Sequence, residues 1–168
     1  MNSAVLINSF RFILLLTAQI LLFNRIDFLG YVNPFPYLLF IILFPVNGNK
    51  SALIISSFFL GLVVDMFGNS GGVHATSCLI LAYLRPYLFK FSFGLSYEYQ
   101  NVKLNDVLTS ERFTFILLAV VIHHFSLFLL EIFQLQLLWD VIIRTLLSGL
   151  FTIVTCVILI YIFKPSRR

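Results

Sequence analysis

The sequence predicts an all-α integral membrane protein with six transmembrane helices and with both termini in the cytoplasm. Of the 168 residues, 60% are hydrophobic and only 11% are charged, whereas about 25% of the residues in a soluble domain carry charge. Six apolar runs approach the roughly 20 residues that a spanning helix needs, and short polar breaks separate them. Because these runs occupy nearly the whole chain, we expect residues 1–168 to form a single polytopic membrane domain, with no separate catalytic domain.

The first two runs cover about 5–23 and 31–46. The first contains Arg11 and is interpreted as a membrane anchor, because further spans follow it and no small-residue cleavage site does. The second begins with the prolines Pro34 and Pro36, which suit an entering turn or the first turn of a helix.

Four further runs complete the set and cover about 51–67, 72–88, 113–135 and 138–163. The one long connection, 89–112, mixes aromatic and charged residues. This composition is typical of a segment at the level of the lipid headgroups, so we expect a cytoplasmic interfacial loop.

The positive charges predict the orientation. Alternating the connections places nine of the eleven lysines and arginines on one side: Arg11, Lys50, Arg85, Lys90, Lys103, Arg112, Lys164, Arg167 and Arg168. The positive-inside rule then places both termini in the cytoplasm. This orientation places Asp65, His74, Glu131, Asp140 and Arg144 in the outer half of the membrane.

The stretch 61–86 is predicted to form a tightly packed helical hairpin. Small residues recur at helical spacing on each side of its glycine-rich turn: Ser57, Gly61, Asp65 and Gly68 before it, and Gly71, Ala75, Cys78 and Ala82 after it. Such small faces let two helix backbones approach closely. We therefore expect Asp65 near the outer edge of a close helix pair.

Asp65 lies in an apolar segment, where an ionisable side chain needs a structural or functional reason. A structural or partner-positioning role is the favoured interpretation, and direct partner contact or ligand binding are alternatives. Asp65 and His74 resemble half of a metal site, but no third ligand follows at helical spacing, so no metal is expected. Cys78 and Cys156 lie in apolar runs and are expected to pack as small residues.

The last two runs carry further polar residues. Asp140 and Arg144 are spaced to pair within one helix, and Glu131 is a rival partner for Arg144. The simplest interpretation is a buried helix–helix contact. The adjacent His123 and His124 could form a proton relay, although packing is favoured.

Read together, these residues resemble the rod shape-determining protein family MreD. The resemblance rests on the motif G-L-x-x-D-M/L-F at 61–67, then Asn69, Gly72, the pair His74-Ala75 and the sequence A-Y-L-R-P at 82–86. The Asn-Pro-Phe-Pro-Tyr sequence at 33–37 agrees with it. Structural or partner-binding roles are therefore expected for Gly61, Asp65, Gly72, His74, Arg85, Pro86, Glu131, Asp140 and Arg144.

The resemblance implies a non-catalytic scaffold subunit of the bacterial cell-elongation (rod) complex, without a cofactor, in the inner membrane. Its implied partners are an MreC-like membrane protein, a RodA-type glycosyltransferase, a class B penicillin-binding transpeptidase and membrane lipids, with MreB contacted through MreC or through the cytoplasmic loop. The family fold is also similar to the substrate-binding subunits of energy-coupling-factor transporters.

Two other functions stay open. A transport subunit for a small, vitamin-like solute is the main alternative. Such proteins commonly carry an A-x-x-x-A docking motif on the first helix, but residues 12–23 of this chain contain a single alanine, Ala18. An intramembrane enzyme is less favoured, because the ionisable residues form no recognised catalytic arrangement.

Overall fold

The computed structural model describes residues 3–26, 28, 30, 32–94 and 109–162. This part of the chain is helical, as predicted, and its only extended pairing is an isolated bridge between Phe28 and Val32. In chain order the elements are α1 (Ser3–Leu21), η1 (Phe23–Arg25), η2 (Pro36–Leu38), α2 (Leu39–Leu43), α3 (Lys50–Gly68), α4 (Val73–Phe93), α5 (Ser110–Ile132), η4 (Leu135–Leu137) and α6 (Leu138–Ile162).

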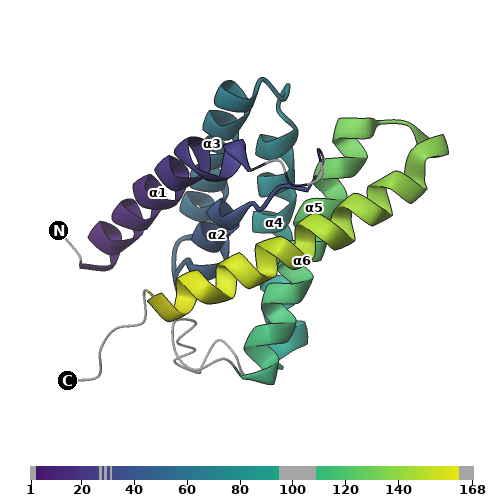
Figure 1. Cartoon of the computed structure of the whole chain (residues 1–168). Coiled ribbons are helices and arrows are strands. Elements are labelled where there is room, and N and C mark those ends of the chain that lie inside the picture. The colour runs from purple at the N-terminus through teal and green to yellow at the C-terminus, as the bar shows by residue number, and fades with distance from the viewer. Residues whose placement is uncertain (1–2, 27, 29, 31, 95–108, 163–168) are drawn as a thin grey trace.

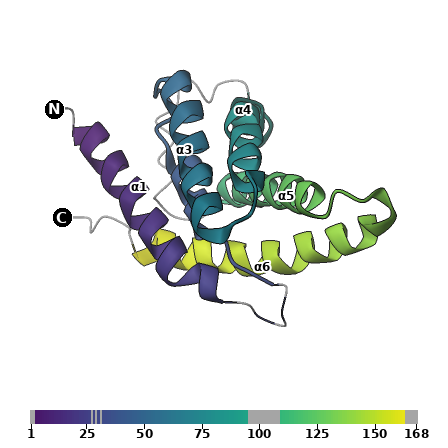
Figure 2. The same cartoon turned by 90° about the horizontal axis from the view of Figure 1, so that it is seen from above.

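The long helices pack in the order of the chain. Helix α3 packs chiefly on α4, α4 on α5 and α5 on α6, while α1 lies along α3 at one edge of the bundle (Figures 1 and 2). The short helix α2 lies inside, between α1, α3 and α4. Figure 1 shows that α1, α3 and α5 begin, and α4 and α6 end, at the same end of the molecule.

Four helical stretches of the described chain are long and apolar enough to cross a membrane: Val5–Arg25, Lys50–Gly68, Ser110–Ile132 and Leu138–Ile162. Helix α4 has 21 residues, which is long enough, but His74, Arg85 and Lys90 make it less apolar. The four apolar stretches agree closely with the predicted runs 5–23, 51–67, 113–135 and 138–163.

The prediction of a spanning helix over 31–46 is wrong. The region contains only the three residues of η2 and the five of α2, and eight helical residues rise about 12 Å against a hydrocarbon core of about 30 Å. Pro34 and Pro36 explain the late start, because proline disfavours helical geometry in the residue before it. Phe35, between them, has φ −118° and ψ 64°. Phe44 is extended at ψ 142° before Pro45, which ends the helix.

The broken segment is nevertheless buried along its whole length from 34 to 44. Irregular backbone can lie among apolar helices only where other groups satisfy its polar atoms. Side chains from distant helices do so: the Phe35 N–H donates to Thr152 Oγ1 at 3.0 Å, and Gln19 Nε2 donates to the Pro34 carbonyl at 3.3 Å. The polar residues of α1 and α6 thus hold a non-helical segment inside the bundle.

Helix α4 extends beyond its predicted end at 88, as far as Phe93. The first residues of the predicted loop 89–112 are therefore helical, and its last three begin α5. Residues 95–108 lie outside the described part of the chain, so the interfacial position of this loop stays a prediction.

The predicted close approach of α3 and α4 is confirmed at Gly61. A Cβ atom on this glycine would lie 2.5 Å from the Ala75 Cα and 2.5 Å from the His74 carbonyl oxygen. Ser57 and Cys78 are fully buried in the same interface. Gly68 and Gly71, which were expected to continue the two small faces, are exposed. The close contact of α3 is therefore with the first turn of α4, and it does not include Gly68 or Gly71.

We predict that Gly61→Ala destabilises the protein by about 1–3 kcal/mol, because the added methyl group meets backbone atoms that cannot move aside. Gly149→Ala is the matched control: it also lies in a helix, but its Cβ would approach only Val120 Cγ1, at an ordinary 3.5 Å. Thermal unfolding of both variants in detergent measures the difference. Equal midpoints for the two variants would contradict the close packing.

Candidate functional site

Asp65 joins the two helices of the hairpin. It lies in the last turn of α3 and is only 5% exposed. Its Oδ1 accepts hydrogen bonds from Ser70 Oγ at 2.5 Å and from the His74 N–H at 3.1 Å, and its Oδ2 accepts one from the Ala75 N–H at 2.8 Å. The first N–H groups of a helix have no partner within it, and the N-terminus favours a negative charge. Asp65 therefore caps the N-terminus of α4.

The turn between the helices explains why this cap comes from α3. Asn69 ends α3 in the left-handed region at φ 50°, which asparagine tolerates well. Gly71 and Gly72 follow at φ 70° and 96°, a conformation natural to glycine. Gly72 is the N-cap residue of α4, and it has no side chain that could bond to the helix. The Asp65 carboxylate supplies the missing acceptor.

A buried chain of polar side chains continues inward from His74. The Tyr37 hydroxyl lies 2.8 Å from His74 Nδ1 and 2.8 Å from His123 Nε2, and all three side chains are buried. A hydroxyl has one proton, so Tyr37 donates to one of the two rings and accepts from the other. The residues come from α4, η2 and α5, so this chain ties the broken segment to two long helices.

His124 makes a second buried connection, toward α6. Its Nδ1 lies 2.9 Å from the Val120 carbonyl, which can only accept, so this nitrogen carries the proton. In a neutral ring, Nε2 then accepts from Thr152 Oγ1 at 2.9 Å, and Thr152 accepts from the Phe35 N–H. Both neighbouring histidines are fully buried because α5 is covered by α4 on one side and by α6 on another.

A cavity of about 950 Å³ opens beside the hairpin turn. Its polar side chains come from five parts of the chain and are Asn24, Asn33, Asn69, Ser70, His74, Glu131 and Arg144. Glu131 and Arg144 both line this cavity. Glu131 and Asp140 are both exposed, so the predicted burial of this polar group is wrong. Asp140 lies in the first turn of α6 and is not among the residues of the cavity wall. Pairing of Arg144 with either carboxylate stays a prediction.

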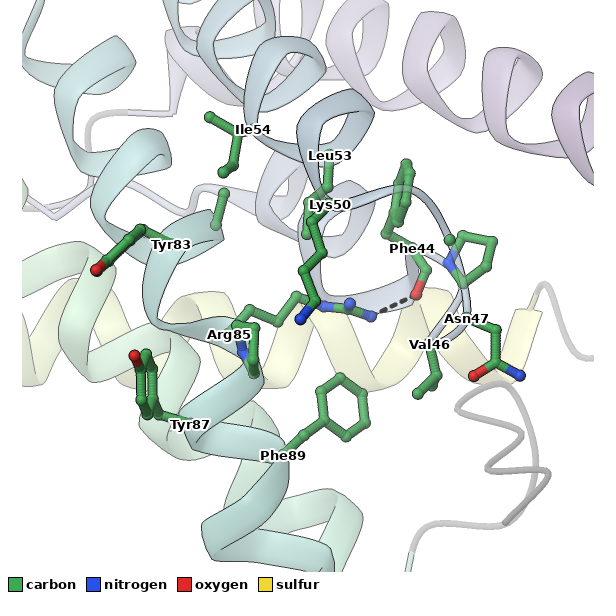
Figure 3. A pocket seen from close by; sticks show the side chains of 14 residues that line it. Phe44, Val46, Asn47, Lys50, Leu53, Ile54, Tyr83, Arg85, Tyr87 and Phe89 are labelled. Carbon is green, nitrogen blue, oxygen red and sulfur yellow. Dashed lines mark hydrogen bonds between the residues drawn. The ribbon is translucent and has the colours of Figure 1, made fainter. Parts of the chain in front are cut away.

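Arg85 and Pro86 lie inside α4, just beyond its midpoint, and do not end the helix. Arg85 is 5% exposed, and its Nη2 donates to the Phe44 carbonyl, as Figure 3 shows. The same nitrogen donates to the Ile42 carbonyl at 3.3 Å. Its guanidinium carbon lies 4.7 Å from the centre of the Phe89 ring. Carbonyl groups at the end of a helix attract cations. Arg85 thus holds the end of α2, a role that the sequence did not predict.

Sequence reasoning missed several residues of this framework. The sequence did not identify Tyr37, Gln19 or Thr152 as residues that bond to distant segments. Arg11 was interpreted only as an orientation signal, but its guanidinium donates a hydrogen bond to the Leu43 carbonyl at 3.3 Å. The available signal was their polarity within apolar runs.

Cys78 and Cys156 are both free and buried. Among the described residues, no group of three or more His, Cys, Asp or Glu is placed to hold a metal ion.

Comparisons with protein-family models, with curated proteins and with solved structures each gave no match.

We predict that Asp65→Ala destabilises the protein by about 3 kcal/mol, because two buried N–H groups lose a charged acceptor. Asp65→Asn should fall between this variant and the wild type, since its amide keeps one accepting oxygen. Asp140→Ala, which removes an exposed carboxylate, is the control. Unfolding midpoints in detergent measure the series, and an Asp65→Ala protein as stable as the control would overturn the assigned cap.

Proposed function

We propose that this chain is a multi-pass protein of the bacterial inner membrane and a non-catalytic scaffold subunit of the cell-elongation complex, similar to MreD. The observation that carries the proposal is the hairpin itself. The motif residues Gly61, Asp65 and His74 set the close approach, the cap and the buried polar chain of one rigid unit. Such a unit suits a protein that presents surfaces to partners.

The geometry supports six crossings with both termini in the cytoplasm. Helices α1 and α3 begin at the same end, so the chain must return between them, and it does so through the buried segment 34–44. A broken crossing of this kind is tolerated where protein surrounds it. Of the seven lysines and arginines among the described residues, Arg11, Lys50, Arg85, Lys90 and Arg112 lie toward the end where α1 begins, and Arg25 and Arg144 do not. Such an excess is what the positive-inside rule expects of the cytoplasmic side.

A groove between α1 and α3 is the favoured surface for a partner helix. It has a volume of about 720 Å³, and its wall combines Phe12 and Phe59 with the small residues Ser9, Ala52 and Ser56. Membrane helices associate through close packing at small residues. The proposed occupant is the membrane helix of an MreC-like protein. A RodA-type glycosyltransferase and a class B penicillin-binding transpeptidase would join the same assembly, and MreB would be reached through MreC.

Photocrosslinking in bacterial membranes tests this surface. A benzophenone amino acid at Ile55, in the groove, should crosslink to an MreC-like protein. The same probe at Ile158, on the outer face of α6, should not, although the two positions are similarly exposed at 57% and 52%. Equal crosslinking at both positions would reject the groove. Purified complexes that contain neither an MreC-like protein nor a wall synthase would reject the function.

The cavity beside the hairpin turn favours one rival function, a solute-binding transport subunit. Its three asparagines and His74 provide the converging polar groups that such a site needs. Mass spectrometry of the protein purified from membranes distinguishes the two proposals. A scaffold should release no small solute in stoichiometric amount. A stoichiometric solute that is lost in a His74→Ala variant would favour transport.

A further inference from the structure

A second cavity lies at the opposite, basic end of the bundle (Figure 3). It has a volume of about 700 Å³ and is bounded by the turn that follows α2, by the first turns of α3 and by the last half of α4. None of the interactions described for the hairpin cap or the histidines uses it.

The charged side chains in the wall of this cavity are Lys50 and Arg85, and both are cations. Figure 3 shows them extending into the cavity from α3 and from α4. Arg85 is buried, and its bonds to the Ile42 and Phe44 carbonyls fix its position. Lys50 is the first residue of α3, where a positive charge opposes the helix dipole. Its position thus costs helix stability, which a bound anion would offset.

The other residues of the cavity wall suit the binding of a lipid molecule. Tyr83 and Tyr87 are more than 60% exposed, as is typical of tyrosines at the boundary between headgroups and acyl chains. Leu53, Ile54 and Ala82 give the cavity an apolar side on which an acyl chain can lie. Basic pockets between membrane helices on the cytoplasmic side are known to bind anionic headgroups.

We propose that this cavity binds an anionic phospholipid, with its phosphate between Lys50 and Arg85 and an acyl chain along the apolar wall. The inference rests on the proposed function only in one respect: the proposed orientation places the lipid in the inner leaflet of the membrane. It requires no wall-synthesis partner, so it can hold or fail independently of the scaffold role.

Native mass spectrometry of the full-length protein in detergent, titrated with phosphatidylglycerol or with phosphatidylcholine, tests the site. Phosphatidylglycerol should bind more tightly, and Lys50→Gln should weaken its binding about fivefold, the factor that corresponds to the ~1 kcal/mol of one basic residue near an anionic lipid. Lys90→Gln is the matched control. It removes the same charge from an exposed position at the same end of the bundle and outside the cavity wall, and it should leave binding unchanged.

Three results would overturn the proposal. Equal affinity for the two lipids would show that the cavity does not recognise negative charge. Equal weakening by Lys50→Gln and Lys90→Gln would show diffuse attraction to the basic surface. Displacement of the lipid by millimolar glycerol phosphate would show a site for a soluble anion. The test does not need an Arg85 variant, which would also remove the support of α2.

Discussion

The Asp65 carboxylate at the start of α4 is the interaction on which the rest of the fold depends. The N–H groups at a helix start need acceptors, because the helix itself supplies none. Gly72 permits the sharp turn but has no side chain to act as a cap. Because the acceptor comes from α3, the two helices must lie close together, and only glycine fits at position 61. The same bonds fix the backbone of His74 and direct its ring toward Tyr37.

A second constraint follows from the broken segment in the centre of the bundle. Its prolines prevent a continuous helix, so its backbone needs partners from elsewhere. Thr152 supplies one from α6, Gln19 supplies one from α1, and Arg85 binds the carbonyls at its far end. Polar residues in membrane helices often mark transport or catalysis. Here many of the buried polar residues form hydrogen bonds to one irregular segment, and this support explains their presence.

These two features differ in how far the sequence could predict them. The hairpin depends on residues close together in the chain, so helical spacing was enough to predict the packing of α3 on α4 and the position of Asp65 at its outer edge. The segment 31–46 was misread because its apolar composition suits a helix, and the prolines were interpreted as a start signal alone. Its support comes from Thr152, 117 residues away from Phe35. No local pattern in the sequence reveals such a pairing.

The use of these polar groups in the fold bears on function. Both oxygens of Asp65 already accept hydrogen bonds, so this carboxylate is poorly placed to act as a general base or as a metal ligand. The Tyr37 hydroxyl is likewise engaged on both sides. The buried polar groups thus stabilise the fold, and an apolar groove lies on the surface between α1 and α3. This combination suits a protein that holds other membrane helices in fixed positions.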